Sequence, residues 1–201
     1  MATYRSNAGF TLIELMVGLA VAGILVTIGT SVSTTYSMQR TFHQQVTWFG
    51  GQLTYARSVA RMRSVQVDVR VKPSTTGIGQ IVEIFEDNNG NGVYDQDKER
   101  SLLPEPDDPP RLNTKITVRA IQEDGSPEPF SDAGTPPSFT VRFDYQGRCL
   151  VVPDPSGDTP EVSVSPTMRR IFEFAYDHKD MPTRLRVEVS SIGVVSYPLP
   201  P

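Results

Sequence analysis

Residues 10–29 form a dense apolar segment that constrains the fold more than any other feature of the chain. The segment reads FTLIELMVGLAVAGILVTIG, and Glu14 is the one charged side chain within it. A helix of about 20 apolar residues spans the hydrocarbon core of a bilayer. Arg5 precedes the segment closely, whereas Arg40 follows only at a distance, which favours a cytoplasmic N-terminus. We therefore predict a single transmembrane helix over residues 10–30.

Two simpler kinds of targeting segment compete with a specialised one. A secretory signal peptide would be cut near Ser31-Val32-Ser33, but the run exceeds the usual apolar core of about 7–15 residues and contains an acid. A plain membrane anchor would leave Glu14 in hydrocarbon, at a cost of about 2.5–3.5 kcal/mol. Acids inside membranes usually have a partner and a function, which neither of these interpretations supplies.

The start of the apolar run resembles a known processing motif. The residues Gly9-Phe10-Thr11-Leu12-Ile13-Glu14-Leu15 are similar to the prepilin motif of type IV pilins and type II secretion pseudopilins. The resemblance implies that residues 1–9 are a leader, that a prepilin peptidase cuts between Gly9 and Phe10, and that Phe10 becomes N-methylated. It also implies that Glu14 pairs with the N-terminal amine of a neighbouring subunit, since paired charges are tolerated in lipid where single ones are costly.

A second apolar pattern extends the predicted helix beyond the first segment. Its members recur at intervals of three or four residues and form one stripe: Phe42, Val46, Phe49, Leu53, Ala56 and Ala60. We therefore expect one helix from about residue 10 to about residue 62, with residues 31–63 as an amphipathic continuation. The stripe is interpreted as core packing. In the first segment, Gly18, Gly23 and Gly29 would allow close helix packing in a filament.

Residues 64–201 carry the pattern of a soluble β-rich domain. Apolar and polar residues alternate over residues 65–71, which predicts a half-buried strand. Further strands are expected over residues 80–85, 115–121, 138–145, 149–152, 170–176, 183–189 and 194–197. Turn signals such as Gly147 and Gly193 separate them. The predicted fold class is α+β and pilin-like: a long N-terminal helix packed on an antiparallel β-sandwich.

The β-rich part resembles the GspH/FimT type of minor pseudopilin. The similar segments are residues 53–60 with the following strand, residues 85–92 and residues 143–147. The resemblance implies a structural subunit of a type II secretion pseudopilus or a type IV pilus, near the tip or in the initiation of assembly. The implied partners are other pilins or pseudopilins, the prepilin peptidase/methyltransferase and the bacterial inner membrane, with the β-rich domain in the periplasm until assembly.

The segment from Asp87 to Lys98 resembles part of a calcium loop. Oxygen-bearing side chains alternate around a glycine: Asp87, Asn89, Asn91, Gly92, Asp95 and Asp97. Such oxygens suit a hard cation. However, Lys98 stands where a calcium loop has its bidentate glutamate, and Asn-Gly turns are also typical of polar hairpins. The interpretation retained is a polar hairpin, with no metal and no cofactor.

The β-rich part suggests two binding functions, one for DNA and one for a secreted substrate. The basic residues Arg169, Arg170, Arg184 and Arg186 could form a patch for DNA. The formal net charge of −4 does not favour nucleic acid, and Gly193 lacks the following arginine of DNA-binding relatives, so DNA is not an expected partner. A pilus-associated module that binds DNA or a secreted substrate remains the alternative function.

Catalysis is not predicted. The chain has two histidines and one cysteine, and no zinc spacing, phosphate loop or nucleophile motif is found in the sequence. A single cysteine also excludes an intramolecular disulfide. Cys149 falls in a predicted strand, where a cysteine is most often a small buried side chain.

Overall fold

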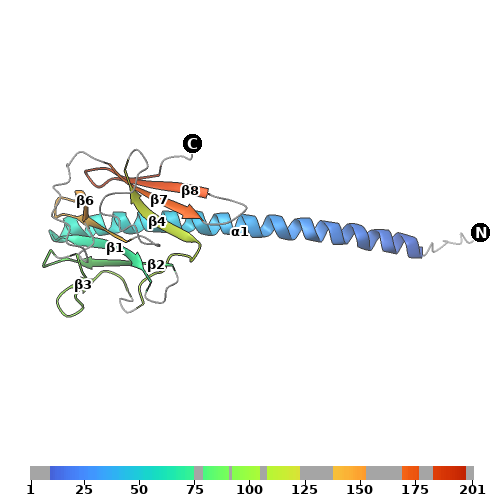
Figure 1. The fold of residues 1–201 in the computed structure, drawn as a ribbon, viewed down its shortest axis with the longest axis horizontal. Coiled ribbons are helices and arrows are strands. Elements are labelled where there is room, and N and C mark those ends of the chain that lie inside the picture. Colours follow the sequence, from blue (N-terminus) through green and yellow to red (C-terminus); the bar gives the residue numbers. More distant parts are fainter. Residues whose placement is uncertain are drawn as a thin grey trace, which may run out of the picture. The chain divides into compact units, whose positions relative to one another are not determined.

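The computed structural model describes residues 10–74, 79–90, 92–104, 108–122, 138–152, 169–176 and 183–197, without the side chains of residues 28–35, 151 and 152. Within these ranges one helix is followed by nine strands in two antiparallel sheets (Figure 1). The α+β prediction is therefore confirmed. The chain divides into two compact units, Met1–His43 and Gln44–Pro201.

Helix α1 spans Leu12–Arg63, close to the predicted range of 10–62. Its C-terminus is closed by a backbone hydrogen bond from Val65 N to the carbonyl of Ala60, 3.2 Å long, while Ser64 adopts a left-handed conformation with φ of 55°. This geometry satisfies carbonyl groups that the end of a helix leaves without partners. Arg63, in the last turn, pairs with Glu86.

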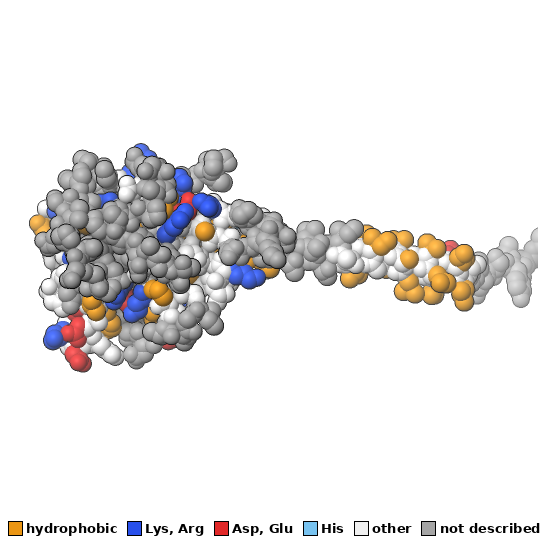
Figure 2. All heavy atoms as spheres, viewed as in Figure 1, with side chains coloured by type: hydrophobic (Ala, Val, Ile, Leu, Met, Phe, Trp, Pro, Cys, Tyr) orange, Lys and Arg blue, Asp and Glu red, His pale blue; other side chains and the backbone are white. Residues whose placement is uncertain are grey.

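The described side chains at the start of α1 are exposed. They include ten large apolar residues between Leu12 and Val26, each more than half exposed. On the face drawn in Figure 2, hydrophobic side chains gather along this part of the helix, and acidic atoms lie near its start. Among the described residues, no helix is long and apolar enough to cross a membrane. That residues 10–30 span a membrane stays a prediction from the sequence.

The first sheet has the strand order β3-β2-β1-β5-β6. Its strands are β1 Val67–Pro73, β2 Gln80–Glu86, β3 Arg100–Ser101, β5 Phe139–Phe143 and β6 Cys149–Val152. The sequence predicted all of these strands except β3, which is too short to show a periodicity. Strand β1 is central. Val67, Val69 and Val71 are fully buried on one face, as expected of a half-buried strand, while on the other face Asp68 is buried and Arg70 and Lys72 are half-buried.

The second sheet has the strand order β4-β7-β8-β9. Its strands are β4 Ile116–Ile121, β7 Arg170–Tyr176, β8 Thr183–Val189 and β9 Val195–Ser196, each within about a residue or two of the predicted positions. A side-chain amide links the two sheets by making the pair of hydrogen bonds that a neighbouring strand's backbone would make. The buried Gln80 of β2 accepts from Val118 N of β4 at 2.8 Å and donates to Val118 O at 3.0 Å.

The core of the unit Gln44–Pro201 forms around the C-terminal part of α1. Phe49 is fully buried and meets Phe172 and Phe174 of β7 edge to face, with ring centroids 5.9 and 5.3 Å apart. Phe139 of β5 stacks on Phe172 at 5.5 Å, which connects the two sheets. The helical stripe that the sequence assigned to core packing is buried throughout.

Two predicted turn glycines meet at the helix surface. Gly147 follows β5 and Gly193 precedes β9, and both have φ of 78°, a conformation that favours glycine. Arg57 of α1 donates from Nε to the carbonyl of Gly147 at 3.3 Å. A Cβ atom at Gly147 would lie 2.7 Å from Cδ of Arg61, so the helix approaches this turn too closely for a larger residue.

We expect Phe49→Ala to lower the free energy of unfolding by about 3–5 kcal/mol, because it removes a buried aromatic ring between the helix and β7. Denaturant titration of the full chain in detergent measures this change. Tyr55→Ala, at a half-exposed position of the same helix, is the matched control and should change stability by less than about 1 kcal/mol. Equal effects of the two substitutions would contradict this assignment of the core.

Candidate functional site

The residues of the predicted processing site lie at the start of α1. Gly9 lies outside the described residues. Phe10 is 83% exposed and stands two residues before the first helical residue. Glu14 is exposed in the first turn of the helix, where a carboxylate also interacts favourably with the helix dipole.

Thr11 and Glu14 form reciprocal hydrogen bonds at the start of the helix. Glu14 N donates to Oγ1 of Thr11 at 3.3 Å, and Oε2 of Glu14 accepts from Thr11 N at 3.5 Å and from Thr11 Oγ1 at 3.4 Å. This is a capping box, which gives partners to amide groups that the first turn would otherwise leave unpaired. The carboxylate is thereby held beside the Phe10–Thr11 peptide by neutral donors.

The sequence interpretation did not identify this role of Thr11. The signal was present, because Thr11-Leu12-Ile13-Glu14 has the spacing of a threonine followed three residues later by a glutamate. The capping box matters for the site because it fixes where the helix begins. It places Glu14 one turn into the helix and close to the predicted new N-terminus.

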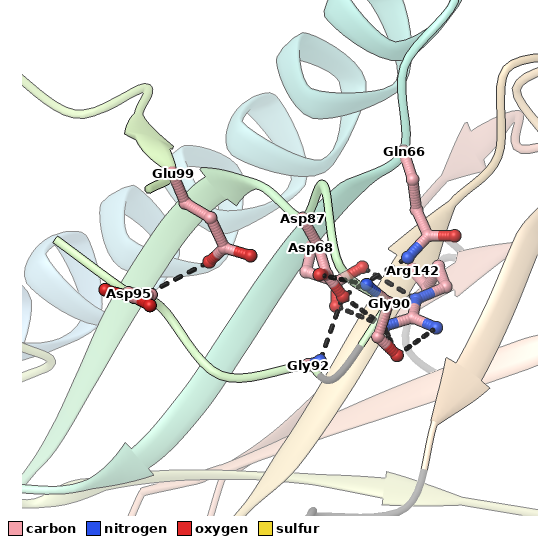
Figure 3. Close-up of polar contacts among 8 residues, drawn as sticks. All are labelled: Gln66, Asp68, Asp87, Gly90, Gly92, Asp95, Glu99 and Arg142. Atoms are coloured by element: carbon pink, nitrogen blue, oxygen red, sulfur yellow. Dashed lines mark hydrogen bonds and ion pairs between the residues drawn. The ribbon is translucent and has the colours of Figure 1, made fainter. Parts of the chain in front are cut away.

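A second polar cluster lies on the first sheet and is drawn in Figure 3. Arg142 of β5 donates from Nε to Asp68 Oδ1 at 2.9 Å and from Nη2 to Asp68 Oδ2 at 2.8 Å. The same Nη2 contacts Asp87, at the end of β2. Both carboxylates are fully buried, and Arg142 is 13% exposed. One guanidinium thus serves two buried carboxylates.

Asp87 also organises the loop that follows β2. Its two oxygens accept from the backbone amides of Gly90 at 2.7 Å and Gly92 at 2.9 Å. Gln66 adds a side-chain donor at 3.2 Å. The loop is therefore anchored to the sheet through Asp87, which Arg142 and these amides hold in place.

The two carboxylates have opposite pKa shifts. Burial raises the pKa of Asp68 to about 7, against the opposing effect of Arg142. Burial also acts on Asp87, but the amides of Gly92 and Gly90, together with Asp68 and Arg142, hold its pKa below the ordinary value. Because one arginine cannot neutralise two buried carboxylates, a proton shared by the pair belongs chiefly on Asp68.

This arrangement accounts for the calcium-like pattern of the loop. The cation that Asp87 contacts is the guanidinium of Arg142. Asp95 pairs with Lys98 at 3.0 Å and accepts from Asp97 N at 3.2 Å, so its carboxylate is occupied as well. The part of the chain that the structure describes has no group of three or more metal-ligating side chains. The described contacts of Asp87 and Asp95 are those of a polar hairpin loop.

The basic residues considered for DNA occupy different surroundings. Arg170 is buried, and Arg169 pairs with Glu188 at 3.4 Å. Arg184 and Arg186 instead lie at a buried carboxylate, Glu173, which Arg119 contacts as well. We refer to Arg119, Arg184 and Arg186 as the arginine cluster. Burial therefore removes Arg170 from the predicted four-residue patch, and Arg169 is engaged by Glu188.

Cys149 is buried in β6, and burial raises the pKa of its thiol to about 12. A protonated, inaccessible thiol is a poor nucleophile. Its environment agrees with the predicted packing role.

The comparisons with known proteins concern the N-terminal segment. A family model described as the prokaryotic N-terminal methylation motif matches residues 4–30. Neither a curated protein nor a solved structure matches the chain at a significant level. The motif indicates a type IV pilin-like protein. It implies processing by prepilin peptidase and assembly with other pilins, and it favours a structural protein over an enzyme.

The raised pKa of Asp68 predicts a pH dependence of stability. The folded state retains a proton on Asp68 up to about pH 7, whereas the unfolded state releases it near pH 4. The stability from this group is therefore fully present below about pH 4 and is lost as the pH rises from about 4 to about 7, by at most about 1.4 kcal/mol per pH unit. Asp87 titrates below this range, since its pKa is lowered.

Urea unfolding at pH 6 and pH 8 measures this loss. We expect Asp68→Asn to lose less stability between the two pH values than the unmodified protein does, because asparagine does not titrate. Asp108→Asn, at an exposed position, is the control and should keep the original pH dependence. An identical pH dependence in the Asp68 variant would show that Asp68 does not titrate near neutral pH.

Proposed function

We propose that this protein is a minor pilin or pseudopilin of the GspH/FimT kind. It would be a structural subunit of a type II secretion pseudopilus or a type IV pilus, placed at the tip or active in the initiation of assembly. The observation that carries the proposal is that the methylation motif, which matches residues 4–30, includes an acid, Glu14, in the first turn of a long helix. The resemblance of residues 53–60, 85–92 and 143–147 supports the subtype.

The first part of α1 supports anchoring and assembly. Leu12, Ile13 and Leu15 are 78, 71 and 58% exposed, and the apolar surface continues along the helix to Val26. An apolar surface of this kind calls for a lipid or protein partner. Cleavage between Gly9 and Phe10 would leave this helix on the mature chain, first as an inner-membrane anchor and then as the assembly element.

The hydrogen bonds of Glu14 are compatible with an exchange of partner. Its donors in the single chain, Thr11 N–H and O–H, are neutral and 3.4–3.5 Å away. The amine that cleavage would create on Phe10 has an ordinary pKa near 8 and is largely protonated at neutral pH. A charge-assisted hydrogen bond to the amine of a neighbouring subunit is stronger than a neutral one, so assembly would replace weak donors by a stronger one.

Two glycines on the same helix support close helix packing. A Cβ atom added at Gly18 or Gly23 would meet nothing within 4 Å in the single chain. The absence of a side chain at these positions therefore serves no packing within the described part of this molecule. Small residues at such positions allow neighbouring helices in a membrane or filament to approach closely.

Mass spectrometry of the protein from its native cell tests the processing step. We expect a mature chain that begins at Phe10 and carries an N-terminal methyl group. A chain that still begins at Met1 would indicate a plain anchor, and a chain that begins at Thr34 would indicate a secretory signal. Either result would reject the proposal.

Glu14→Leu tests the assembly step. We expect the variant to be inserted and cut normally but to enter filaments poorly, by about tenfold or more, because the neighbouring amine loses its counter-charge. Incorporation is measured by immunoblotting of sheared filaments against the membrane fraction.

Two control variants separate charge from helix structure. Thr11→Val removes the side-chain half of the capping box and keeps the carboxylate, whereas Val17→Leu changes only apolar volume. If Thr11→Val impairs incorporation as strongly as Glu14→Leu does, the helix start and not the charge is responsible. Normal incorporation of Glu14→Leu would overturn the assembly role of this residue.

A further inference from the structure

The arginine cluster lies on the face of the second sheet that points away from α1. Glu173 of β7 stands directly opposite Arg119 of β4 and directly opposite Arg186 of β8. Arg184 lies two residues before Arg186 and therefore on the same face. Phe172 and Phe174, on either side of Glu173 in the strand, contact the helix on the opposite face.

The three arginines share one buried carboxylate unequally. Arg119 holds Glu173 Oε1 closely, from Nη2 at 2.6 Å and from Nε at 3.2 Å, and the Glu173 side chain is 2% exposed. Arg184 and Arg186 each reach Glu173 at 3.5 Å, and they remain 67 and 46% exposed. Each of these guanidinium groups therefore lies on a partly exposed side chain and has more N–H donors than its one contact with Glu173 uses.

Among the described residues, the cluster carries more positive charge than the neighbouring acids neutralise. Three guanidinium groups surround one carboxylate, which leaves two surplus charges even when Glu173 is ionised. The other acid on this face, Glu188, pairs with Arg169 at 3.4 Å. The remaining side chains of these strands that share the face within the described residues are uncharged: Thr117, Ile121, Ile171, Ala175 and Ser196.

The chemistry of the cluster favours a carboxylate-bearing partner. A guanidinium binds a carboxylate through two parallel hydrogen bonds, and Arg184 and Arg186 come from one strand, which fixes their spacing. Phosphate has similar geometry. However, nucleic acids are held by several basic groups on basic domains, whereas this chain has a net charge of −4 and two surplus charges here.

We propose that the arginine cluster is a docking site for an acidic polypeptide segment, with Arg184 and Arg186 as the contact residues and Glu173 and Arg119 as their support. The site is built on the sheet, so it is formed before the partner arrives. In a filament an adjacent subunit would supply the acidic segment, and this choice of partner rests on the proposed function. The binding of an acidic segment does not itself require assembly.

Fluorescence anisotropy with the unassembled full chain in detergent tests the site. The probe is a labelled hexaglutamate peptide at low salt, where exposed charges are least screened. We expect Arg184→Gln/Arg186→Gln to weaken binding by about tenfold, as for the loss of two partly exposed ion pairs. The fold should be retained, since Arg119 still pairs with Glu173.

The matched control is Lys98→Gln/Arg100→Gln, which removes the same charge from exposed positions at the loop and β3. It should bind the peptide as the unmodified protein does. Equal loss in both variants, or no binding by the unmodified protein, would overturn the proposal. Where the double substitution lowers the melting temperature, Arg184→Gln alone gives the comparison, with a smaller expected loss.

An oligothymidylate of the same charge as the peptide distinguishes the two kinds of polyanion. We expect it to bind more weakly than hexaglutamate at equal ionic strength. Tighter binding of the oligonucleotide would replace the acidic polypeptide by nucleic acid and overturn the proposal. Because this assay uses unassembled protein, its failure is separate from a failure of the Glu14 variants in filaments.

Discussion

The contact between Phe49 of α1 and the two phenylalanines of β7 is the interaction on which the β-rich unit depends. Phe172 and Phe174 face the helix, and Phe139 of the other sheet stacks on Phe172, so both sheets reach the helix through one aromatic group. Gln80 adds a pair of hydrogen bonds between β2 and β4. The helix is therefore part of the core and cannot be regarded as an appendage of a self-sufficient β domain.

The same helix begins with a surface of a different kind. At residues 12–27 its apolar side chains are exposed, whereas the stripe that reaches Ala60 is buried. One continuous helix thus combines a segment whose described apolar side chains are exposed with a segment that completes a core. Such a combination suits a subunit whose β-rich unit folds first and whose N-terminal apolar segment then packs against lipid or against neighbouring helices.

The carboxylates of the molecule are stabilised in two contrasting ways. Asp68, Asp87 and Glu173 are buried, and each has an arginine within hydrogen-bond distance. Glu14 is exposed, and its partner in the described part of the chain is the neutral Thr11. A buried charge is best paired within the fold because desolvation is costly. Glu14, which is exposed and has only neutral donors, is free of that cost and is suited to a charged partner from another molecule.

The sequence by itself determined the elements of this protein. The 3.6-residue period predicted the long helix, the two-residue period predicted eight of the nine described strands, and the motif around Phe10 predicted the methylation signal that the family model also finds. These features are local, so a pattern of neighbouring residues is enough to specify them. The Thr11–Glu14 capping box was equally local and could have been predicted.

Only the tertiary structure decided which polar residues meet. The sequence does not reveal that Asp68, on the central strand β1, pairs with Arg142, 74 residues later. Arg184 and Arg186 were grouped with Arg169 and Arg170 by position in the sequence, and the strand register instead placed them around Glu173. Strand order and register come from packing between distant segments, and a charge in the sequence does not reveal which distant partner will neutralise it.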